Sequence, residues 1–549
     1  MARDSTVSPS EKIRAFLSRY GFLLFSLGYL ALALKLLPDY GPVADTFKNL
    51  REGQINLDFL LKQEPLSFRD QIMLAQQIHG AFFFMIAEAS KRLFSGVLGW
   101  FSPLAAPHVF LPFLTVFFLN IYDRFLKTKI GAWNAFVACA LLLTYPHFWG
   151  YSFNNIKDLP LLFFFSIAIF AFYGWIESGR RKTFYLYAFC IAFGIAVLSK
   201  LYAVLALPIL ALWLVLLKLL PFSFRSEDAP DGPLPPAPPL RKSLLHLLAG
   251  LGIAGLLAAI FFMPAFFSLH DKWGFLNTKP DLMQGDIYSR YARTGNFYTW
   301  AQVFFITPCL TLLAAVWGFF RFLSAPLRKP WALLLLVWFV FIMSIFCSPL
   351  IPGHSGIRHF MMFLVPFSCF AALGIDQAAG GLERFLKGRK QALRVTLGLL
   401  VIAAQIWGLA ETHPYESTFF NAFAGGLKGA QEKKIAWARD FWLTSYLEAT
   451  SWINKNAPGN AVLFTSEKNG NNIAAYYPLR PDIRPSRYYA KDLPLPANSI
   501  LFLSYKDRPE FYVSPVLGRE DVEKETPPMK KVYDIKRQGG EILAIYYQP

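Results

Sequence analysis

Long apolar runs recur along most of this sequence, and they restrict its fold more than any other feature. A helix of about 20 apolar residues crosses the hydrocarbon core of a bilayer, and only helices or closed barrels satisfy their backbone polar groups in lipid. We therefore predict an all-α polytopic membrane protein. The eleven predicted spans lie at 20–37, 108–126, 131–148, 159–176, 183–198, 201–219, 243–264, 300–323, 331–348, 357–376 and 393–410.

Composition supports a membrane protein and argues against three other classes. Hydrophobic residues make up 55% of the chain and charged residues 16%, whereas soluble domains average about 25% charged. The apolar content excludes disorder for most of the chain, and five cysteines inside apolar runs form no disulfide framework. The net charge of +18 comes from Lys and Arg in short loops between runs, so we predict no nucleic-acid partner.

The basic residues also predict an orientation. If the N-terminus is cytoplasmic, the loops richest in Lys and Arg are cytoplasmic as well, as the positive-inside rule requires. The first run shows no cleavage pattern, so we interpret it as an uncleaved span. Eleven spans then place the chain after residue 410 outside the membrane, on the side where Lys157, Lys200 and Arg358 are the exceptional basic residues of short loops.

We predict two domains from this topology. A transmembrane domain at 1–410 includes a first outer loop at 38–107, with an interfacial helix near 76–94, and a Pro-rich cytoplasmic linker at 221–242. A small extracytoplasmic α/β domain follows at 411–549. Its expected elements are a helix at 441–456 and strands at 461–465, 499–505, 532–535 and 542–547, the last two forming a hairpin around Gly539 and Gly540.

Polar residues that burial in lipid does not explain gather on the predicted outer side. Ionisable groups at membrane depth are costly, and they usually have a function. The candidates lie at the ends of apolar runs or in the first outer loop: Asp39, Asp45, His108, Asn154, Asn155, Lys157, Asp158, Lys200, Arg358 and His359.

Each candidate has an ordinary structural alternative. Asp39 is typical of a helix end, Asp45 of an N-cap, and residues 154–158 of a turn before proline. Single basic residues at span ends commonly extend to lipid headgroups. In combination, however, carboxylates that accept protons and cations that neutralise phosphate favour a group transfer in which a lipid phosphate leaves.

The segment at 145–160 reads Tyr-Pro-His-Phe-Trp-Gly-Tyr-Ser-Phe-Asn-Asn-Ile-Lys-Asp-Leu-Pro. It resembles the phospholipid-carrier-dependent glycosyltransferases of the membrane GT-C fold, a group similar to protein O-mannosyltransferases and lipid A aminoarabinose transferase. The family pattern is Gly-His followed by Asn-Pro-Lys-Asp-Ile-Pro, so Tyr151 and Ile156 are departures. Further similarity lies at 356–360, 413–416, 420–421, 425–426 and 440–442.

The resemblance implies a transferase that moves a sugar from a polyprenyl-phosphate carrier to a hydroxyl of a protein, lipid or glycan acceptor. It implies inverting displacement at the outer face of a membrane, which we expect to be a bacterial inner membrane with the C-terminal domain in the periplasm. No metal ion or other cofactor is required by this chemistry, although a divalent metal is compatible with it.

The resemblance also assigns roles to the candidates. The family's acidic pair aligns with Asp45-Thr46, so one acid is kept and its neighbour is replaced. Asp45 is the expected general base. The other expected roles are catalytic for Asp158 and Asp39, donor-phosphate binding for Arg358, Lys157, Lys200 and His359, and positioning of acceptor or donor for Asn155, Asn154 and His108.

Two other classes of function remain as alternatives. A lipid or glycolipid transporter or flippase typically has internal repeats with interrupted spans and polar sites near the middle of the membrane. The sequence shows no such repeat, and its polar clusters lie at one surface. A non-catalytic scaffold that presents the outer domain would leave these clusters without a role. The enzyme hypothesis requires that Asp45 and Arg358 meet in one site.

Overall fold

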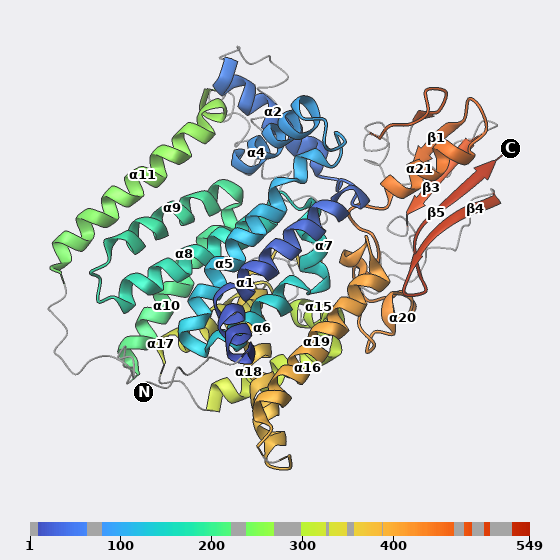
Figure 1. Ribbon diagram of the computed structural model, residues 1–549. Helices are drawn as coiled ribbons and strands as arrows, with labels where there is room; N and C mark the ends of the chain where they lie inside the picture. Colours follow the sequence, from blue (N-terminus) through green and yellow to red (C-terminus); the bar gives the residue numbers. More distant parts are fainter. Residues whose placement is uncertain are drawn as a thin grey trace.

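A helical body and a small sheet make up the protein (Figure 1). The computed structural model describes residues 9–62, 80–220, 238–267, 298–324, 329–348, 356–386, 388–465, 477–485, 499–504 and 530–548. Most of the predicted Pro-rich linker at 221–242 lies outside these residues.

Seven helical segments in the described residues are long and apolar enough to cross a membrane. They contain α1 (Pro9–Leu36), α5 (Phe110–Ile130), α8 (Asp158–Glu177), α10 (Ala206–Leu219) after the turn η4 (Leu201–Leu205), α11 (Leu240–Phe267), α18 (Leu364–Glu383) and α19 (Lys390–Thr412). Four shorter apolar helices are α6 (Ala132–Leu143), α9 (Thr183–Ser199), α16 (Cys309–Ser324) and α17 (Pro330–Ile345). Each predicted run corresponds to one of these helices, and the prediction of an all-α polytopic membrane body is confirmed.

Two of the predicted runs are not single helices. The run at 131–148 divides into α6 and α7 (Pro146–Asn154), and the run at 300–323 divides into α15 (Tyr298–Ile306) and α16. Proline has no backbone N–H, and its ring disfavours helical geometry in the residue before it. Pro146 and Pro308 therefore end the preceding helices. The first break lets α7 lead into the polar loop at 155–157.

The first outer loop is mainly helical where the structure describes it. Here α2 (Thr46–Lys62), which the sequence did not predict, packs on α4 (Phe82–Lys91), followed by the π-helical turn η2 (Arg92–Val97). A Cβ at Gly53 would lie 2.1 Å from the carbonyl oxygen of Phe84, so glycine permits this close approach. The predicted helix near 76–94 corresponds to α4, and its expected first residues lie outside the described ranges.

The C-terminal part contains α20 (Gly426–Glu432), α21 (Tyr446–Asn456) and a five-stranded sheet. The strands are β1 (Val462–Thr465), β2 (Arg484–Pro485), β3 (Ser499–Ser504), β4 (Lys530–Arg537) and β5 (Gly540–Gln548), in the order β2-β1-β3-β5-β4. Strand β1 is parallel to β2 and β3, whereas β5 is antiparallel to β3 and β4. The four predicted strands and the hairpin are confirmed, and β2 was not predicted.

The predicted helix at 441–456 begins later, at Tyr446, because Asp440 holds the preceding residues in a turn. Its carboxylate accepts hydrogen bonds from the backbone N–H of Ser445 at 2.8 Å and of Trp442 at 3.3 Å, and from the Thr444 hydroxyl at 3.0 Å. These bonds compete with helical backbone bonds. Trp442 is thus placed on a turn rather than on a helix.

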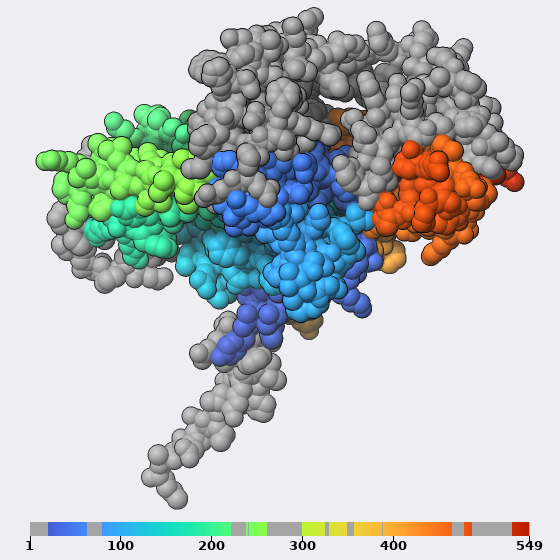
Figure 2. Space-filling model, turned by 90° about the horizontal axis from the view of Figure 1, so that it is seen from above, coloured from blue at the N-terminus to red at the C-terminus, as the bar shows by residue number. Residues whose placement is uncertain are grey.

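This turn packs against the segment that follows α1. The backbone N–H of Ala44 donates to the carbonyl of Trp442 at 2.8 Å, and a Cβ at Gly41 would lie 2.5 Å from the carbonyl oxygen of Thr444. Viewed from above, α2 and its neighbours (blue) lie between α11 (green) and the C-terminal part (orange) in Figure 2. The C-terminal chain therefore contacts the membrane body just before Asp45. A boundary between two domains near residue 410 stays a prediction.

Candidate active site

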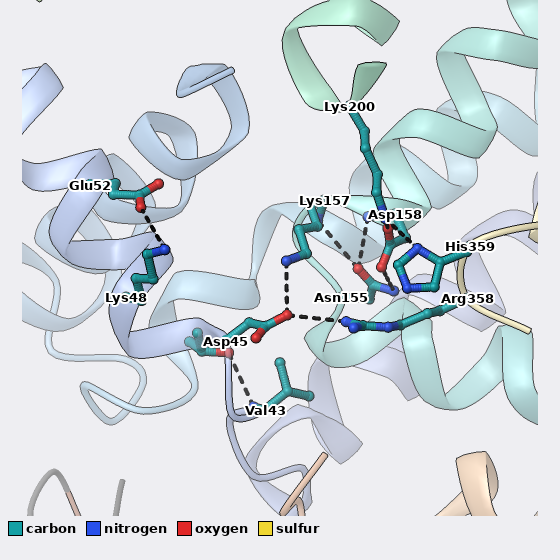
Figure 3. Close-up of polar contacts among 11 residues, drawn as sticks. Val43, Asp45, Lys48, Glu52, Asn155, Lys157, Asp158, Lys200, Arg358 and His359 are labelled. Atoms are coloured by element: carbon teal, nitrogen blue, oxygen red, sulfur yellow. Dashed lines mark hydrogen bonds and ion pairs between the residues drawn. The ribbon is translucent and has the colours of Figure 1, made fainter. Parts of the chain in front are cut away.

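Four chain segments, each a break between helices, bring the candidate side chains together (Figure 3). Asp45 immediately precedes α2, and residues 155–157 join α7 to α8. Lys200 separates α9 from η4. Arg358 and His359 lie before α18. The polar side chains thus lie at breaks between helices rather than within apolar helices. Together they form a polar cluster on one side of the helical body.

The first half of this cluster is an outer triad made of Asp45, Lys157 and Arg358. The Oδ2 atom of Asp45 accepts from Lys157 Nζ at 2.8 Å and from Arg358 Nη1 at 3.1 Å. The Asp45 side chain is 36% exposed, whereas each of the two cations is 11% exposed. Burial alone would raise the pKa of Asp45, but the two neighbouring cations outweigh it and hold this pKa well below its usual range.

Arg358 is fixed by aromatic residues as well as by Asp45. Its guanidinium lies over the ring of Trp442, with 4.5 Å between Cζ and the ring centroid, and Trp442 packs edge-on against Tyr151. Gly356 precedes Arg358 with a φ of +68°, and a Cβ there would lie 3.3 Å from the Phe441 ring. The Nε atom of Arg358 is buried and has no hydrogen-bond partner among the described residues. It can donate to a ligand.

The second half is an inner triad made of Asp158, Lys200 and His359. Lys200 Nζ donates to Asp158 Oδ1 at 2.6 Å and lies 2.8 Å from His359 Nδ1. The Asp158 side chain is fully buried and that of Lys200 is 5% exposed. Burial lowers the pKa of Lys200 to about 8, although the charge of Asp158 partly offsets this shift.

Asn155 connects the two triads through the backbone. Its Oδ1 accepts from the N–H of Asp158 at 2.8 Å and of Lys157 at 3.3 Å, and its Nδ2 donates to Asp158 Oδ2 at 3.3 Å. The Ser199 hydroxyl donates to the carbonyl of Lys157 at 2.6 Å. Asn155 thus fixes the turn from which Lys157 and Asp158 extend to different triads.

The remaining predicted site residues lie apart from these contacts. Asn154 Nδ2 donates to the carbonyl of Gly41 at 3.4 Å, and its Oδ1 has no partner in the described part of the chain. His108 is 1% exposed in the turn η3 (Ala106–His108), and its Nε2 likewise lacks a partner among those residues. Within the described ranges, neither side chain forms a hydrogen bond to a residue of the triads. Their positioning roles stay predictions.

Asp39 belongs to a separate cluster. Its carboxylate lies 3.3 Å from His413 Nε2, and His413 Nδ1 lies 3.0 Å from Glu416 Oε1, which also accepts from the Tyr40 hydroxyl at 2.7 Å. Burial lowers the pKa of His413, but Glu416 and Asp39 outweigh it and raise this pKa above its usual value. His413 and Glu416 also line an apolar cavity of about 520 Å³, together with residues of α1 and α19. The structure therefore does not bring Asp39 into the Asp45 site.

Two residues near Asp45 were not predicted as part of the site. Glu52 lies on α2. Its side chain is only 4% exposed, and it pairs with Lys48 at 3.7 Å. Burial raises the pKa of Glu52 to about 7, and the charges of Lys48 and Lys157 reduce this shift. Trp442 is the other residue. In the sequence, the segment at 440–442 shows only a similarity to a family pattern, and no residue spacing connects Trp442 to Arg358.

Thr46 occupies the position where the family usually has a second acid. Its side chain is buried, and its Oγ1 accepts the backbone N–H of Val43 at 3.1 Å. This bond closes the turn before α2, so Thr46 has a structural role. Among the described residues, no group of three or more His, Cys, Asp or Glu side chains is arranged to hold a metal ion. That no cofactor is required stays a prediction.

Comparisons with known proteins give a match to one family and matches to solved structures. A profile of the family described as dolichyl-phosphate-mannose-protein mannosyltransferase matches residues 79–227. A search of curated proteins finds no match. Among solved structures, ArnT from Cupriavidus metallidurans bound to undecaprenyl phosphate is 12% identical with a TM-score of 0.44, over 96% of this chain and 98% of that chain. The Archaeoglobus fulgidus oligosaccharyltransferase in the apo form is 13% identical with a TM-score of 0.42, over 86% of this chain and 62% of that chain.

The matched family segment contains the loop at 155–158 and Lys200, whereas Asp45 and Arg358 lie outside it. The family match confirms, for residues 79–227, the predicted resemblance to the phospholipid-carrier-dependent glycosyltransferases.

Proposed function

We propose that this protein is an integral-membrane glycosyltransferase that moves a sugar from a polyprenyl-phosphate carrier to an acceptor hydroxyl. The observation that carries the proposal is the convergence of Asp45, Lys157 and Arg358 on one partly exposed point. A carboxylate that accepts a proton and two cations that bind phosphate are the groups this transfer requires. The match to a family named for a dolichyl-phosphate-linked donor supports the class of donor.

The reaction is a single displacement at the anomeric carbon. The acceptor oxygen forms a bond to this carbon, the bond from the carbon to the phosphate oxygen breaks, and polyprenyl phosphate leaves with the bonding electrons. The proton of the acceptor hydroxyl passes to Asp45. Attack opposite to the leaving group predicts inversion at the anomeric carbon.

Arg358 and Lys157 stabilise the charge that develops on the leaving phosphate. A guanidinium binds two phosphate oxygens at once, and a lysine adds a compact charge. The Nε of Arg358, which has no hydrogen-bond partner in the described part of the chain, gives the guanidinium a second edge for such a contact. Hydrogen-bond donors that the protein holds in place before the reaction commonly increase the rate by about 10²–10³.

Binding of the donor would also activate the base. Without donor, both cations neutralise Asp45 and hold its pKa low, which makes it a weak base. A donor phosphate competes for Lys157 and Arg358, so the groups that lower this pKa are withdrawn from the carboxylate. The base therefore gains proton affinity when the phosphate is in place. A positioned general base contributes about 10²–10⁴ in rate.

The inner triad holds these groups in position. Lys157 is adjacent in sequence to Asp158, and Arg358 is adjacent to His359. Because Asp158 and His359 both contact the buried Lys200, they fix the backbone from which the two outer cations extend. Asp158 is thus a positioning residue in this proposal, rather than a group that touches the substrate.

The site would face the outer surface of a bacterial inner membrane, with the N-terminus in the cytoplasm. The distribution of Lys and Arg between loops supports this orientation. Contact of the C-terminal part with the segment before Asp45 places both on the same side of the body. Trp442 connects this part to the site, so an acceptor held by the C-terminal part would lie near Asp45.

The direct test measures donor binding and sugar transfer by the full-length protein in lipid nanodiscs. Radiolabelled polyprenyl-phosphate mannose serves as the donor probe, and membrane and soluble extracts of the host serve as acceptor sources. The Arg358→Ala variant is expected to lose about 10²–10³ in transfer rate and to bind the donor more weakly.

Arg537→Ala is the matched control. Arg537 also lies over an aromatic ring, that of Tyr415 at 4.9 Å, but it is outside both triads. Unchanged donor affinity and rate in Arg358→Ala would place the phosphate elsewhere. If the wild-type protein instead moved the intact donor between leaflets with its sugar–phosphate bond unbroken, the flippase alternative would replace this proposal.

A further inference from the structure

A second basic site lies at the ends of the membrane helices opposite to the active site. Helix α8 starts at Asp158 in the inner triad and ends at Glu177, and α9 returns from Thr183 to Ser199 beside Lys200. The turn at 178–182 is therefore at the other membrane surface. Figure 1 shows this turn next to the start of α11.

A cavity of about 240 Å³ occupies this position. Its wall is formed by the end of α8, the following turn, and the first turns of α9 and α11. The residues that matter for the argument are Trp175, Arg180, Arg181, Lys242, Ser243 and His246.

The cavity has an excess of positive charge. Arg180, Arg181 and Lys242 all line it, and none of them forms an ion pair with a carboxylate in the described part of the chain. Glu177, the acid next to this turn, is paired with Lys129 and accepts the Tyr173 hydroxyl at 3.0 Å. His246 is engaged by the Tyr187 hydroxyl at 3.0 Å. The lining thus favours an anion.

Three buried polar atoms of the lining lack a hydrogen-bond partner among the described residues: Trp175 Nε1, Arg181 Nε and Ser243 Oγ. Trp175 is 9% exposed and Ser243 is 6% exposed. An indole N–H and a guanidinium N–H only donate, and a hydroxyl donates as well. Since an unmade buried hydrogen bond is costly, these donors indicate a ligand that carries several acceptor oxygens.

The N-terminal ends of α9 and α11 at the cavity also favour an anion. Thr183 belongs to the first turn of α9, which has no side-chain cap, and Ser243 belongs to the first turn of α11. The first N–H groups of a helix have no partner within the helix, and the helix dipole is positive there. Both ends therefore favour a group such as phosphate.

We propose that this cavity binds the phosphate headgroup of an anionic phospholipid from the leaflet opposite to the active site. A lipid is favoured over a soluble phosphate because an apolar surface adjoins the cavity. Leu244, Leu245 and Leu248 follow Ser243 on α11 and are 51%, 59% and 56% exposed. Acyl chains would cover these leucines while the headgroup fills the basic cavity. Basic pockets between membrane helices are known to suit such headgroups.

The test uses the full-length protein in a neutral detergent. Phosphatidylglycerol, phosphatidylcholine and inorganic phosphate are titrated separately, and bound lipid is counted by native mass spectrometry alongside the thermal midpoint. Phosphatidylglycerol is expected to bind and to raise the thermal midpoint by about a few degrees, because a ligand that binds the folded state stabilises it. Phosphatidylcholine and inorganic phosphate are expected to do neither.

The variant Arg181→Gln/Lys242→Gln is expected to bind phosphatidylglycerol about 30-fold more weakly, since two surface charges near a headgroup are removed. Trp175→Phe keeps an aromatic ring in the cavity wall but removes the indole N–H. Its affinity for phosphatidylglycerol is expected to fall about fivefold. Lys218→Gln, exposed at the end of α10 on the same surface, is the control.

Equal phosphatidylglycerol binding by the wild type and both cavity variants would overturn the proposal. Saturation by inorganic phosphate, with loss of that binding in Arg181→Gln/Lys242→Gln, would show a soluble-anion site and would also overturn it. Neither outcome bears on sugar transfer, because the cavity and the active site lie at opposite membrane surfaces.

Discussion

The two triads of the active site use similar residues in very different surroundings. In the outer triad, Asp45 is 36% exposed and is shared by Lys157 and Arg358. In the inner triad, the Asp158 side chain is fully buried and the side chain of its partner Lys200 is 5% exposed. Solvent and ligands reach the first carboxylate, whereas the protein encloses the second.

This difference suits the outer triad to the reaction and the inner triad to structural support. An ion pair that touches water contributes little to stability, and its partners can be exchanged for a substrate phosphate. A buried pair cannot exchange its partners without leaving a charge unpaired in a medium of low polarity. The chain couples the two, because neighbouring residues, Lys157 with Asp158 and Arg358 with His359, belong to different triads. Substitutions of the two aspartates should therefore have different effects.

The largest effect is expected for Asp158→Asn. It leaves the buried Lys200 without its counter-charge, which typically costs about 3–5 kcal/mol. The thermal midpoint in detergent should fall strongly, and sugar transfer should be lost with it because both outer cations lose their support. Asp376→Asn is the control, since Asp376 pairs with Arg394 where both side chains are partly exposed, and its loss should cost about 1 kcal/mol or less.

The double variant Asp158→Leu/Lys200→Met refines this prediction. Replacing a whole buried ion pair with apolar residues is often close to neutral for stability. The double variant should therefore recover much of the midpoint but not the activity. A midpoint for Asp158→Asn that equals the wild-type value would show that the inner triad does not support the site.

Asp45→Asn is expected to show the opposite pattern. Sugar transfer should fall by about 10²–10⁴, while the thermal midpoint should fall less than in Asp158→Asn, because the Asp45 carboxylate is partly exposed although its two cations are largely buried. Asp58→Asn is the matched control from the same loop. Asp58 pairs with Arg92 at 2.8 Å outside both triads, so its loss should leave the rate unchanged. Unchanged turnover in Asp45→Asn would remove this carboxylate from the mechanism.

Much of the body and half of the site follow from the sequence because local rules determine them. Apolar length determines the spans, and the loop at 154–158 stands out because polar residues interrupt two apolar runs. Pro146 and Pro308 could have predicted the two helix breaks, but hydropathy averaged over a whole run hides a single proline. Asp39 was grouped with Asp45 because both follow the first run, yet the chain turns between them.

Other parts of the site depend on contacts between distant segments. Trp442 reaches Arg358 because Asp440 holds a turn against the segment at 41–44, and no local pattern encodes that packing. Glu52 looks like an ordinary polar residue of an amphipathic helix. Its burial depends on tertiary packing around α2, which α4 approaches closely at Gly53. Tertiary packing, rather than residue type, determines these two positions.

Glu52→Gln extends the comparison to a carboxylate that is buried like Asp158 but pairs with a solvent-exposed cation, Lys48 at 3.7 Å. The folded protein raises the pKa of Glu52 from 4.5 to about 7, so it binds this proton more tightly than the unfolded chain does. The stability linked to this group is fully present below pH 4.5 and is lost as the pH rises to about 7. The free energy of unfolding of Glu52→Gln, relative to that of the wild type, should therefore be roughly 2–3 kcal/mol higher at pH 8 than at pH 4.5.

The measurement is the thermal midpoint across this pH range. Glu432→Gln serves as the control, because Glu432 on α20 is 65% exposed. If Glu52→Gln and the wild type kept a constant difference from pH 4.5 to pH 8, pairing rather than burial would govern the proton on Glu52.

The smallest effect is expected for Trp442→Leu. A guanidinium over an indole contributes about 1 kcal/mol, so donor affinity should fall about fivefold while Asp45 keeps both cations. Trp437→Leu is matched, since Arg439 lies over Trp437 at 4.8 Å in the same segment but outside the triads. Equal donor affinity in these two variants would mean that Asp45 alone orients Arg358. A weaker affinity only in Trp442→Leu would mean that the outer triad, unlike the inner one, depends on the C-terminal part of the chain.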